Sequence, residues 1–339
     1  MSGKVLFERR SAASRLLDPR QGFSPAAAPV EVRRDPVTGR TVRVGHFGAV
    51  RPVPLDLERY AAPEVKGHCP FCPGSREREL PRFDPTVIPG GRLEAGEGLL
   101  APNLFPYDVH GAVCVLTRDH VVGLEGLTRR RLADGLGLGL AYWKAVARAD
   151  PPHRYPVMAW NYMPPSGGGL VHPHIQFFRF DIPPRALAEV LDASARRPGV
   201  WAALVEAERA RGERYLGCTG PWEWFVPFAP VGIWGEVWAL APGLGHLEAL
   251  ESAGWGALLD GLGRVLACFA DAGIHSFNAA LFVGPDAGEP LPAQLRIVPR
   301  THLNLRDFAP DLNFFQAVLE EPVCAVWPED LARQLRPFF

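Results

Sequence analysis

Short apolar segments bounded by glycine and proline alternate along the chain with longer segments whose apolar residues follow helical spacing. Segments 111–117 (GAVCVLT) and 155–161 (YPVMAWN) are predicted to be strands. Segment 127–150 (LTRRRLADGLGLGLAYWKAVARAD) is predicted to be a helix with Thr128 as its N-cap. A second helix is predicted from Pro184, because proline suits the first turn of a helix.

The first third of the chain has a weaker pattern. Residues 1–30 are predicted to be a loosely structured arm that ends in SPAAAP. The sequence DPVTGR (Asp35–Arg40) predicts a turn, and TVRV after it predicts a short strand. Residues 45–110 are rich in proline and glycine, so we expect ordered loops with few strands there.

Two segments, 115–146 and 239–270, share one pattern: a strand, a histidine, the sequence L-E-x-L, and a helix that contains D-G-L-G. The pattern favours a duplicated unit of strands and one main helix, with a boundary between residues 185 and 215. We therefore divide the chain into halves at 1–185 and 186–339. Chance similarity between two helices rich in Leu, Gly and Ala is the alternative.

Composition narrows the class of protein. The chain has 339 residues, 47% of them hydrophobic, and a net charge of −1 with no long run of like charge. This balance favours neither nucleic acid nor a membrane surface as a partner. No apolar run is long enough to span a bilayer, and the first residues lack the apolar core of a signal peptide. We expect a cytoplasmic protein whose six cysteines are thiols or metal ligands.

The chemistry is concentrated in GGGLVHPHIQFF, residues 167–178. On a strand, His172, His174 and Gln176 project from one face, and the proline between the histidines marks a strand start or an edge. The amides of Gly167, Gly168 and Gly169 are suited to phosphate oxygens. A histidine beside them could attack phosphorus and form a covalent intermediate, with the glutamine as hydrogen-bond donor. Two packed or surface histidines are the alternative.

A C-x-x-C pair upstream points to a metal. Two cysteines at this spacing present both thiolates to one ion. A redox role would need a helix that starts at the motif, and the prolines within and after it argue against one. Zinc needs two further ligands, one from TRDH and one from the two strand histidines. The favoured set is Cys69, Cys72, His120 and His172, which leaves His174 as the nucleophile.

These motifs together resemble the galactose-1-phosphate uridylyltransferase family of the histidine-triad superfamily, which includes ADP-glucose phosphorylase-like members. The resemblance covers most of the chain from about residue 30. It rests on RRDPVTG, RP at 51–52, CPFCPG, ELPRF, PNLFPYD, TRDH, HPHIQ and VWPEDLARQL, which occur in the family's order.

The resemblance implies an α+β fold of two tandem histidine-triad-like halves, each an antiparallel sheet with packed helices, and a homodimer. The second half has AQLRIVPR where the first has HPHIQFF, so it would lack the catalytic histidines. The implied reaction is nucleotidyl transfer through a covalent nucleotidyl-histidine. His174 would be the nucleophile, Gln176 its phosphoryl partner, and zinc would lie on the four ligands above. Asn103 would contact the nucleoside, and Asn161 and Arg51 the phosphates.

The implied substrates are a nucleotide sugar or nucleotide and a phosphorylated small molecule such as a sugar 1-phosphate. A phosphorylase or hydrolase that uses phosphate or water as acceptor is the alternative, and a nucleotide-binding protein without activity is a third reading. Three positions depart from the family pattern: Gly48 replaces an arginine, Gly169 a serine, and Leu104 an aspartate of some uridylyl enzymes. These departures bear on the choice of sugar and base.

Overall fold

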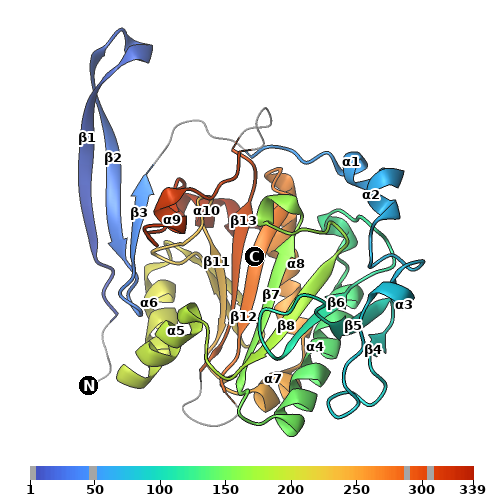
Figure 1. Ribbon diagram of the computed structural model, residues 1–339. Helices are drawn as coiled ribbons and strands as arrows, with labels where there is room; N and C mark the ends of the chain where they lie inside the picture. Colours follow the sequence, from blue (N-terminus) through green and yellow to red (C-terminus); the bar gives the residue numbers. More distant parts are fainter. Residues whose placement is uncertain (1–4, 46–51, 286–290, 304–308) are drawn as a thin grey trace.

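The chain folds into two β-sheets of unequal size with helices packed around the larger one (Figure 1). The computed structural model describes residues 5–45, 52–285, 291–303 and 309–339. The small sheet has four strands in the order β1-β2-β3-β14. The large sheet has ten strands in the order β4-β5-β6-β8-β7-β12-β13-β11-β10-β9. The predicted α+β class is confirmed.

Every neighbouring pair in the large sheet is antiparallel. Read from its two edges, the sheet repeats one order of elements, and β7 and β12 join at the middle. The duplication and the division at residue 185 stay predictions. The strands are β4 (Leu93–Ala95), β5 (Gly98–Pro102), β6 (Gly111–Val115), β7 (Tyr155–Tyr162), β8 (His174–Phe180), β9 (Tyr215–Thr219), β10 (Trp222–Phe225), β11 (Val237–Ala241), β12 (Ser276–Phe282) and β13 (Ala293–Arg300).

Two long helices, α4 (Arg129–Ala149) and α8 (Gly256–Asp271), pack on one face of this sheet and enclose the main core. Their glycines explain the D-G-L-G pattern. A Cβ at Gly135 would overlap the side chain of Leu116, which follows β6, and a Cβ at Gly261 would overlap Trp224. Glycine therefore lets each helix approach the sheet closely, at some cost in helix propensity. Thr128 caps α4 as predicted, its side chain accepting from the amide of Arg131.

The opposite face of the sheet is covered by two separate groups of elements. Helices α5 (Arg185–Arg196) and α6 (Val200–Arg211) bury a second core against the strands of the second half. Pro184 lies at the N-cap of α5, just before the predicted first turn. Over the first half lie the C-x-x-C segment and the short helices α1 (Leu57–Ala61), α2 (Pro63–Gly67) and α3 (Arg76–Glu79). Region 52–110 thus has few strands, as expected, but also three short helices among its described residues.

The remaining helices are α7 (Leu247–Ala253), α9 (Phe314–Ala317) and α10 (Pro328–Leu335). The predicted strands 111–117 and 155–161 correspond to β6 and β7, and the predicted turn at Asp35–Arg40 is followed by β3 (Thr41–Gly45). No helix in the described part of the chain combines the length and apolarity that a bilayer crossing requires.

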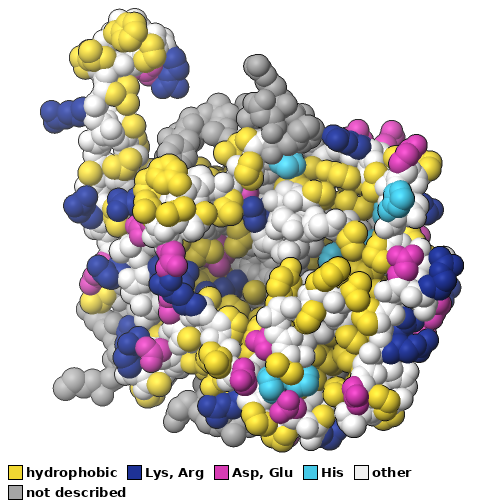
Figure 2. Space-filling view, in the orientation of Figure 1, with side chains coloured by type: hydrophobic (Ala, Val, Ile, Leu, Met, Phe, Trp, Pro, Cys, Tyr) yellow, Lys and Arg dark blue, Asp and Glu magenta, His cyan; other side chains and the backbone are white. Residues whose placement is uncertain are grey.

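The prediction of a loose arm at residues 1–30 is wrong for residues 9–30. Strands β1 (Arg9–Asp18) and β2 (Ser24–Arg34) form a long antiparallel hairpin that projects from the body (Figure 1). Its tip carries exposed apolar side chains, including Phe23 (Figure 2). Pro25 and Pro29 lie where β2 pairs only with β1, so their missing N–H groups break no second ladder. Strand β14 (Val323–Cys324) completes this sheet, parallel to β3.

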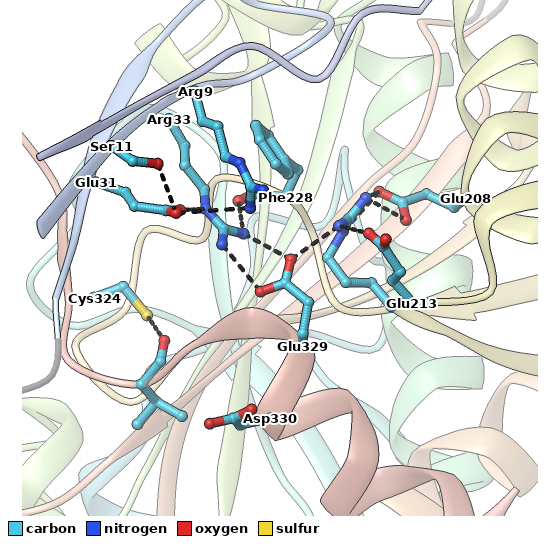
Figure 3. A network of polar contacts seen from close by, with 12 residues as sticks. Arg9, Ser11, Glu31, Arg33, Glu208, Glu213, Phe228, Cys324, Glu329 and Asp330 are labelled. Atoms are coloured by element: carbon cyan, nitrogen blue, oxygen red, sulfur yellow. Dashed lines mark hydrogen bonds and ion pairs between the residues drawn. The ribbon is translucent and has the colours of Figure 1, made fainter. Parts of the chain in front are cut away.

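A buried ion network fastens the hairpin sheet to the body (Figure 3). Glu329 at the start of α10 accepts two hydrogen bonds from Arg33 of β2, at 2.8 and 3.0 Å, and one from Arg214 at 2.9 Å. Arg214 also contacts Glu208 of α6 at 3.0 Å. Burial opposes ionisation of Glu329, but the two arginines outweigh it and lower its pKa to about 2. Burial of Glu208 dominates over Arg214 and raises its pKa to about 7.

Candidate active site and metal centre

The structure brings the two cysteines of the C-x-x-C segment together with the two histidines that were predicted to complete a metal site. One ligand atom from each of Cys69, Cys72, His120 and His172 lies within 4.8 Å of all the others, and all four residues are buried. Nδ1 of His172 lies 3.5 Å from Sγ of Cys69, and Nδ1 of His120 lies 3.4 Å from Sγ of Cys72. Two thiolates and two imidazoles at these separations match the donor set of a closed structural zinc site.

The surroundings of these ligands fit a cation. Nε2 of His172 lies 2.9 Å from the carbonyl oxygen of Thr117, which assigns the proton to Nε2 and leaves Nδ1 as the donor to a metal. Burial lowers the pKa of His172 to about 4, so the ring is neutral. Burial raises the pKa of Cys69 to about 11, so a thiolate at this position needs a cation beside it.

The loop that carries His120 is held from outside. Glu97, in the turn before β5, accepts from the hydroxyl of Thr117 at 2.7 Å and from the amide of Arg118 at 3.0 Å. These contacts, the Arg118 amide first, lower the pKa of Glu97 to about 2. The same threonine supplies the carbonyl that orients His172, so Glu97 fixes both the loop and a ligand behind it.

His174 begins β8 and is oriented by its own strand. Its Nδ1 donates to the carbonyl oxygen of His172 at 2.8 Å. Nε2 is therefore the ring nitrogen left for a substrate, with its lone pair free when the ring is neutral. Burial lowers the pKa of His174, which favours that neutral form. The residue that supplies this carbonyl, His172, is also one of the four predicted metal ligands.

A cavity of about 330 Å³ lies in front of this histidine. Gln176, two residues further along β8, also lines this cavity. So does Asn103, whose Nδ2 is buried and has no hydrogen-bond partner among the described residues. An unpartnered buried amide costs free energy, which a ligand in the cavity would recover. The other lining residues are Pro70, Phe71, Glu79, Leu80, Pro102, Leu104, Phe105, Tyr107, Val113, Gly169 and Leu170.

The glycine run only partly matches its predicted role. The amide of Gly167 donates to the carbonyl of Pro164 at 2.8 Å, so it is not available to a phosphate, and the prediction is wrong for that amide. Gly167 instead serves the turn, since its φ of +84° favours glycine. Within the described residues, the amides of Gly168 and Gly169 make no hydrogen bond, and Gly169 borders the cavity.

Asn161 lies near the end of β7, and a residue of the second half fixes its side chain. Nδ2 of Asn278 on β12 donates to Oδ1 of Asn161 at 2.6 Å and to the carbonyl of Ser166 at 2.9 Å. Asn278 in turn accepts from Arg300, which is paired with Asp311. Sequence reasoning missed these three residues. A lone asparagine in the apolar strand SFNAALF was the signal that could have indicated Asn278.

Two positions named from the sequence, Arg51 and Gly48, lie outside the described residues. Leu104 lines the cavity and is 63% exposed. Because it is a leucine, the cavity has no carboxylate at this position.

Comparison with curated sequences finds a relative of similar length. No family model matches the chain. An "Uncharacterized protein" of Archaeoglobus fulgidus is 28% identical over 315 residues, which cover 91% of this chain and 92% of the relative.

Solved structures resemble the chain over nearly its whole length. An ADP-glucose phosphorylase from Arabidopsis thaliana with bound ADP-glucose matches with a TM-score of 0.66 and 19% identity, covering 91% of this chain and 98% of that one. A galt-like protein from the same plant matches with a TM-score of 0.64 and 18% identity, covering 90% and 98%. A uridylyltransferase matches with a TM-score of 0.57 and 21% identity, covering 91% and 98%. The chain therefore has the fold of these phosphorylase and uridylyltransferase structures, as its resemblance to the galactose-1-phosphate uridylyltransferase family predicted.

Proposed function

We propose that this protein is a nucleotidyltransferase of the galactose-1-phosphate uridylyltransferase type that transfers a nucleoside monophosphate through His174. The observation that carries the proposal is the orientation of that ring: Nδ1 is bound to the carbonyl of His172, and the residue lines a 330 Å³ cavity with two amide side chains. The donor would be a nucleotide sugar or nucleotide, and the acceptor a phosphorylated small molecule such as a sugar 1-phosphate.

In the first step, Nε2 of neutral His174 attacks the α-phosphorus of the donor. A nitrogen–phosphorus bond forms, the bond to the bridging oxygen breaks, and the leaving phosphate takes the electron pair. The ring becomes a positively charged nucleotidyl-imidazolium that keeps its proton on Nδ1. The carbonyl of His172 accepts that proton's hydrogen bond at 2.8 Å and so stabilises the charge.

Negative charge on the transferred phosphoryl group needs donors that are already in place. The side chain of Gln176 and the amide of Gly169 border the cavity, and the amide of Gly168 beside them also makes no hydrogen bond with a described residue. Asn161 contributes a further donor, because the bond from Asn278 occupies its oxygen and leaves its NH₂ free. Each preorganised donor of this kind is typically worth about 10²–10³ in rate. Arg51 is proposed as a phosphate ligand from the family resemblance, and Asn103 as a nucleoside contact.

Zinc would be held by Cys69, Cys72, His120 and His172. When bound, such a four-ligand ion contributes folding energy rather than reaction chemistry. Its position matters nonetheless, because His172 is both ligand and partner of His174. The metal would thus fix the backbone carbonyl that holds the nucleophile.

The second step has two candidate acceptors. A sugar 1-phosphate would give a transferase, and inorganic phosphate or water would give a phosphorylase or hydrolase. The similarity to an ADP-glucose phosphorylase, at a TM-score of 0.66, is the reason to include inorganic phosphate among the acceptors. A homodimer is expected with either acceptor.

The test separates the two steps. The protein is incubated with ADP-glucose, UDP-glucose, GDP-glucose or ATP, and its mass is measured intact. An added nucleoside monophosphate that maps to His174 supports the proposal, and no adduct with any donor contradicts it. The adduct is then isolated and mixed with glucose 1-phosphate, inorganic phosphate or buffer alone. The acceptor that releases a nucleotide product fastest identifies the reaction.

A further inference from the structure

A second cluster of histidine and aspartate side chains lies at the end of the sheet away from His174. Strands β6 and β8 run antiparallel, with Val115 opposite His174 and Gly111 opposite Phe178. The cluster gathers at the latter end. His110 precedes β6, and the segment between α4 and β7 contributes Asp150 and His153. Figure 2 shows histidine side chains bordered by acidic ones near the lower ends of β7 and β8.

Three ligand atoms meet there. Oδ2 of Asp150 lies 3.0 Å from Nε2 of His110 and 3.0 Å from Nδ1 of His153. The two rings are perpendicular, with centroids 4.6 Å apart and planes at 88°. One ligand atom from each of the three residues lies within 4.8 Å of the other two. Two imidazoles thus converge on a single carboxylate oxygen.

His153 is buried, and its two ring nitrogens lack hydrogen-bond partners among the described residues. His153 is only 8% exposed, and neither of its ring nitrogens makes a hydrogen bond of acceptable geometry with any described residue. Nδ1 is close to Asp150 but poorly directed for a hydrogen bond. Leaving a buried polar group in this state costs free energy, which a ligand would recover. A cation between the two rings and the carboxylate of Asp150 would accept the lone pair of a ring nitrogen of His153, to which no described group donates a hydrogen bond.

A buried arginine holds both histidine segments in place. The amide of Arg179 donates to the carbonyl of His110 at 3.0 Å, and its Nε donates to the carbonyl of His153. Arg179 is fully buried, and its Nη1 also binds the carbonyl of Trp143 in α4. One residue, through its backbone amide and its side chain, therefore ties together the two connections that carry the proposed ligands, an arrangement that fixes a site in advance of binding.

We propose that His110, Asp150 and His153 form a second metal site, which binds a divalent transition-metal ion such as Zn²⁺. Two nitrogen donors and one carboxylate suit this class, whereas Mg²⁺ and Ca²⁺ prefer oxygen donors alone. Asp108 and Asp181 also lie near His153, with ligand atoms within 4.8 Å of it and of each other. They could supply a fourth ligand or hold a bound water.

The test counts metal on the full chain. Wild-type protein and two variants, Asp150→Asn and His110→Gln, are equilibrated with buffered Zn²⁺, and zinc per chain is measured by mass spectrometry. We expect two ions in the wild type and one in each variant. The affinity of the site at His110, Asp150 and His153 should fall at least about tenfold in each variant. Circular dichroism checks that the variants fold. Asp192→Asn, at an exposed surface carboxylate, is the matched control and should keep both ions.

Titration with Co²⁺ distinguishes the two sites. Cobalt on cysteine thiolates absorbs strongly in the near ultraviolet, and cobalt on histidine and aspartate does not. The second equivalent should therefore bind without thiolate absorption and should disappear in Asp150→Asn. A wild type that saturates at one thiolate-bound equivalent overturns the proposal. So does an unchanged count of two in both folded variants.

Discussion

Asn278 of β12 donates through Nδ2 to Oδ1 of Asn161 on β7 at 2.6 Å, and the two residues are 117 positions apart in the chain. This bond crosses the joint between the two sets of strands. It occupies Oδ1 of Asn161, so the NH₂ of that side chain is the group left for a ligand. The second half therefore takes part in the candidate site although its own strands lack the H-P-H-x-Q sequence.

Replacing Asn278 should slow transfer without removing the nucleophile. Asn278→Ala frees Asn161 to rotate, and we expect kcat for nucleotidyl transfer to fall about tenfold, below the 10²–10³ of a direct donor. Asn278→Asp should cost more, because a carboxylate accepts rather than donates and would reverse the amide of Asn161. Steady-state kinetics with separate kcat and KM provide the measurement. Equal activity of the two variants and the wild type would show that the contact is only structural.

Removing the imidazole of His174 should abolish transfer. His174→Ala is expected to form no covalent nucleotide adduct while folding and zinc content persist, since its ring is not a metal ligand. Gln176→Ala should slow transfer by about 10²–10³ but still allow the adduct. Intact mass after incubation with a donor nucleotide distinguishes these outcomes. Near-normal turnover by His174→Ala would refute the mechanism.

Loss of a cysteine ligand should lower zinc content and stability together. Structural zinc contributes on the order of 10 kcal/mol to the folding of small domains, so we expect a large fall in the melting temperature of Cys69→Ser. Cys218→Ser is the matched control, because Cys218 is exposed and lies outside the cluster. Zinc analysis must be read with the cobalt spectrum, since ions on His110 and Asp150 would remain. Full thiolate absorption in a Cys69→Ser/Cys72→Ser variant would contradict the assignment.

The network at Glu329 should matter more for stability than any surface pair. Glu329→Gln leaves Arg33 and Arg214, both 1% exposed at the side chain, without their shared carboxylate. We expect the free energy of unfolding to fall by about 3 kcal/mol, at the low end for buried pairs because Glu329 is itself partly exposed. Asp192→Asn breaks an exposed pair and should cost less than about 1 kcal/mol. Urea denaturation of both variants provides the comparison.

The free energy of unfolding should depend on pH in opposite directions through two carboxylates of this network, Glu329 and Glu208. The pKa of Glu329 is lowered to about 2, so its stabilisation is complete above its unfolded pKa of about 4.3 and is lost as pH falls toward 2. The pKa of Glu208 is raised to about 7, so its contribution is present below about pH 4.3 and is lost as pH rises through 7. Glu208→Gln should therefore flatten the neutral side of the stability profile. An unchanged slope between pH 5 and 7 would refute the shift at Glu208.

Sequence patterns predicted a strand at HPHIQ correctly because alternation of side chains along a strand is a local property. The alternation in HPHIQ places His174 and Gln176 on one face whatever surrounds the strand. The meeting of Cys69, Cys72, His120 and His172 in one cluster was also predicted, from the C-x-x-C spacing and the histidines of TRDH and HPHIQ. The N-terminal hairpin could not be recognised in this way, because ladder hydrogen bonds rather than an apolar face maintain it. Its strand β1 is almost entirely exposed, so no hydrophobic period marks it.

Contacts between distant segments were beyond the sequence. Asn278 acts on Asn161 only because β7 and β12 are neighbours, and no local signal gives that pairing. The amide of Gly167 was misjudged for a related reason. A glycine run indicates exposed backbone, but whether an amide is already bound depends on the turn it forms, here with Pro164.

The central position of β7 in the sheet has a consequence for synthesis of the chain on the ribosome. Both neighbours of β7 are needed to satisfy its ladder, and one of them, β12, is translated long after β8. A nascent chain that ends before Ser276 therefore exposes the edge of β7, which is rich in large apolar residues. Unpaired edges of this kind recruit other chains. Slow translation or early termination between the two halves should accordingly yield aggregates rather than a folded fragment.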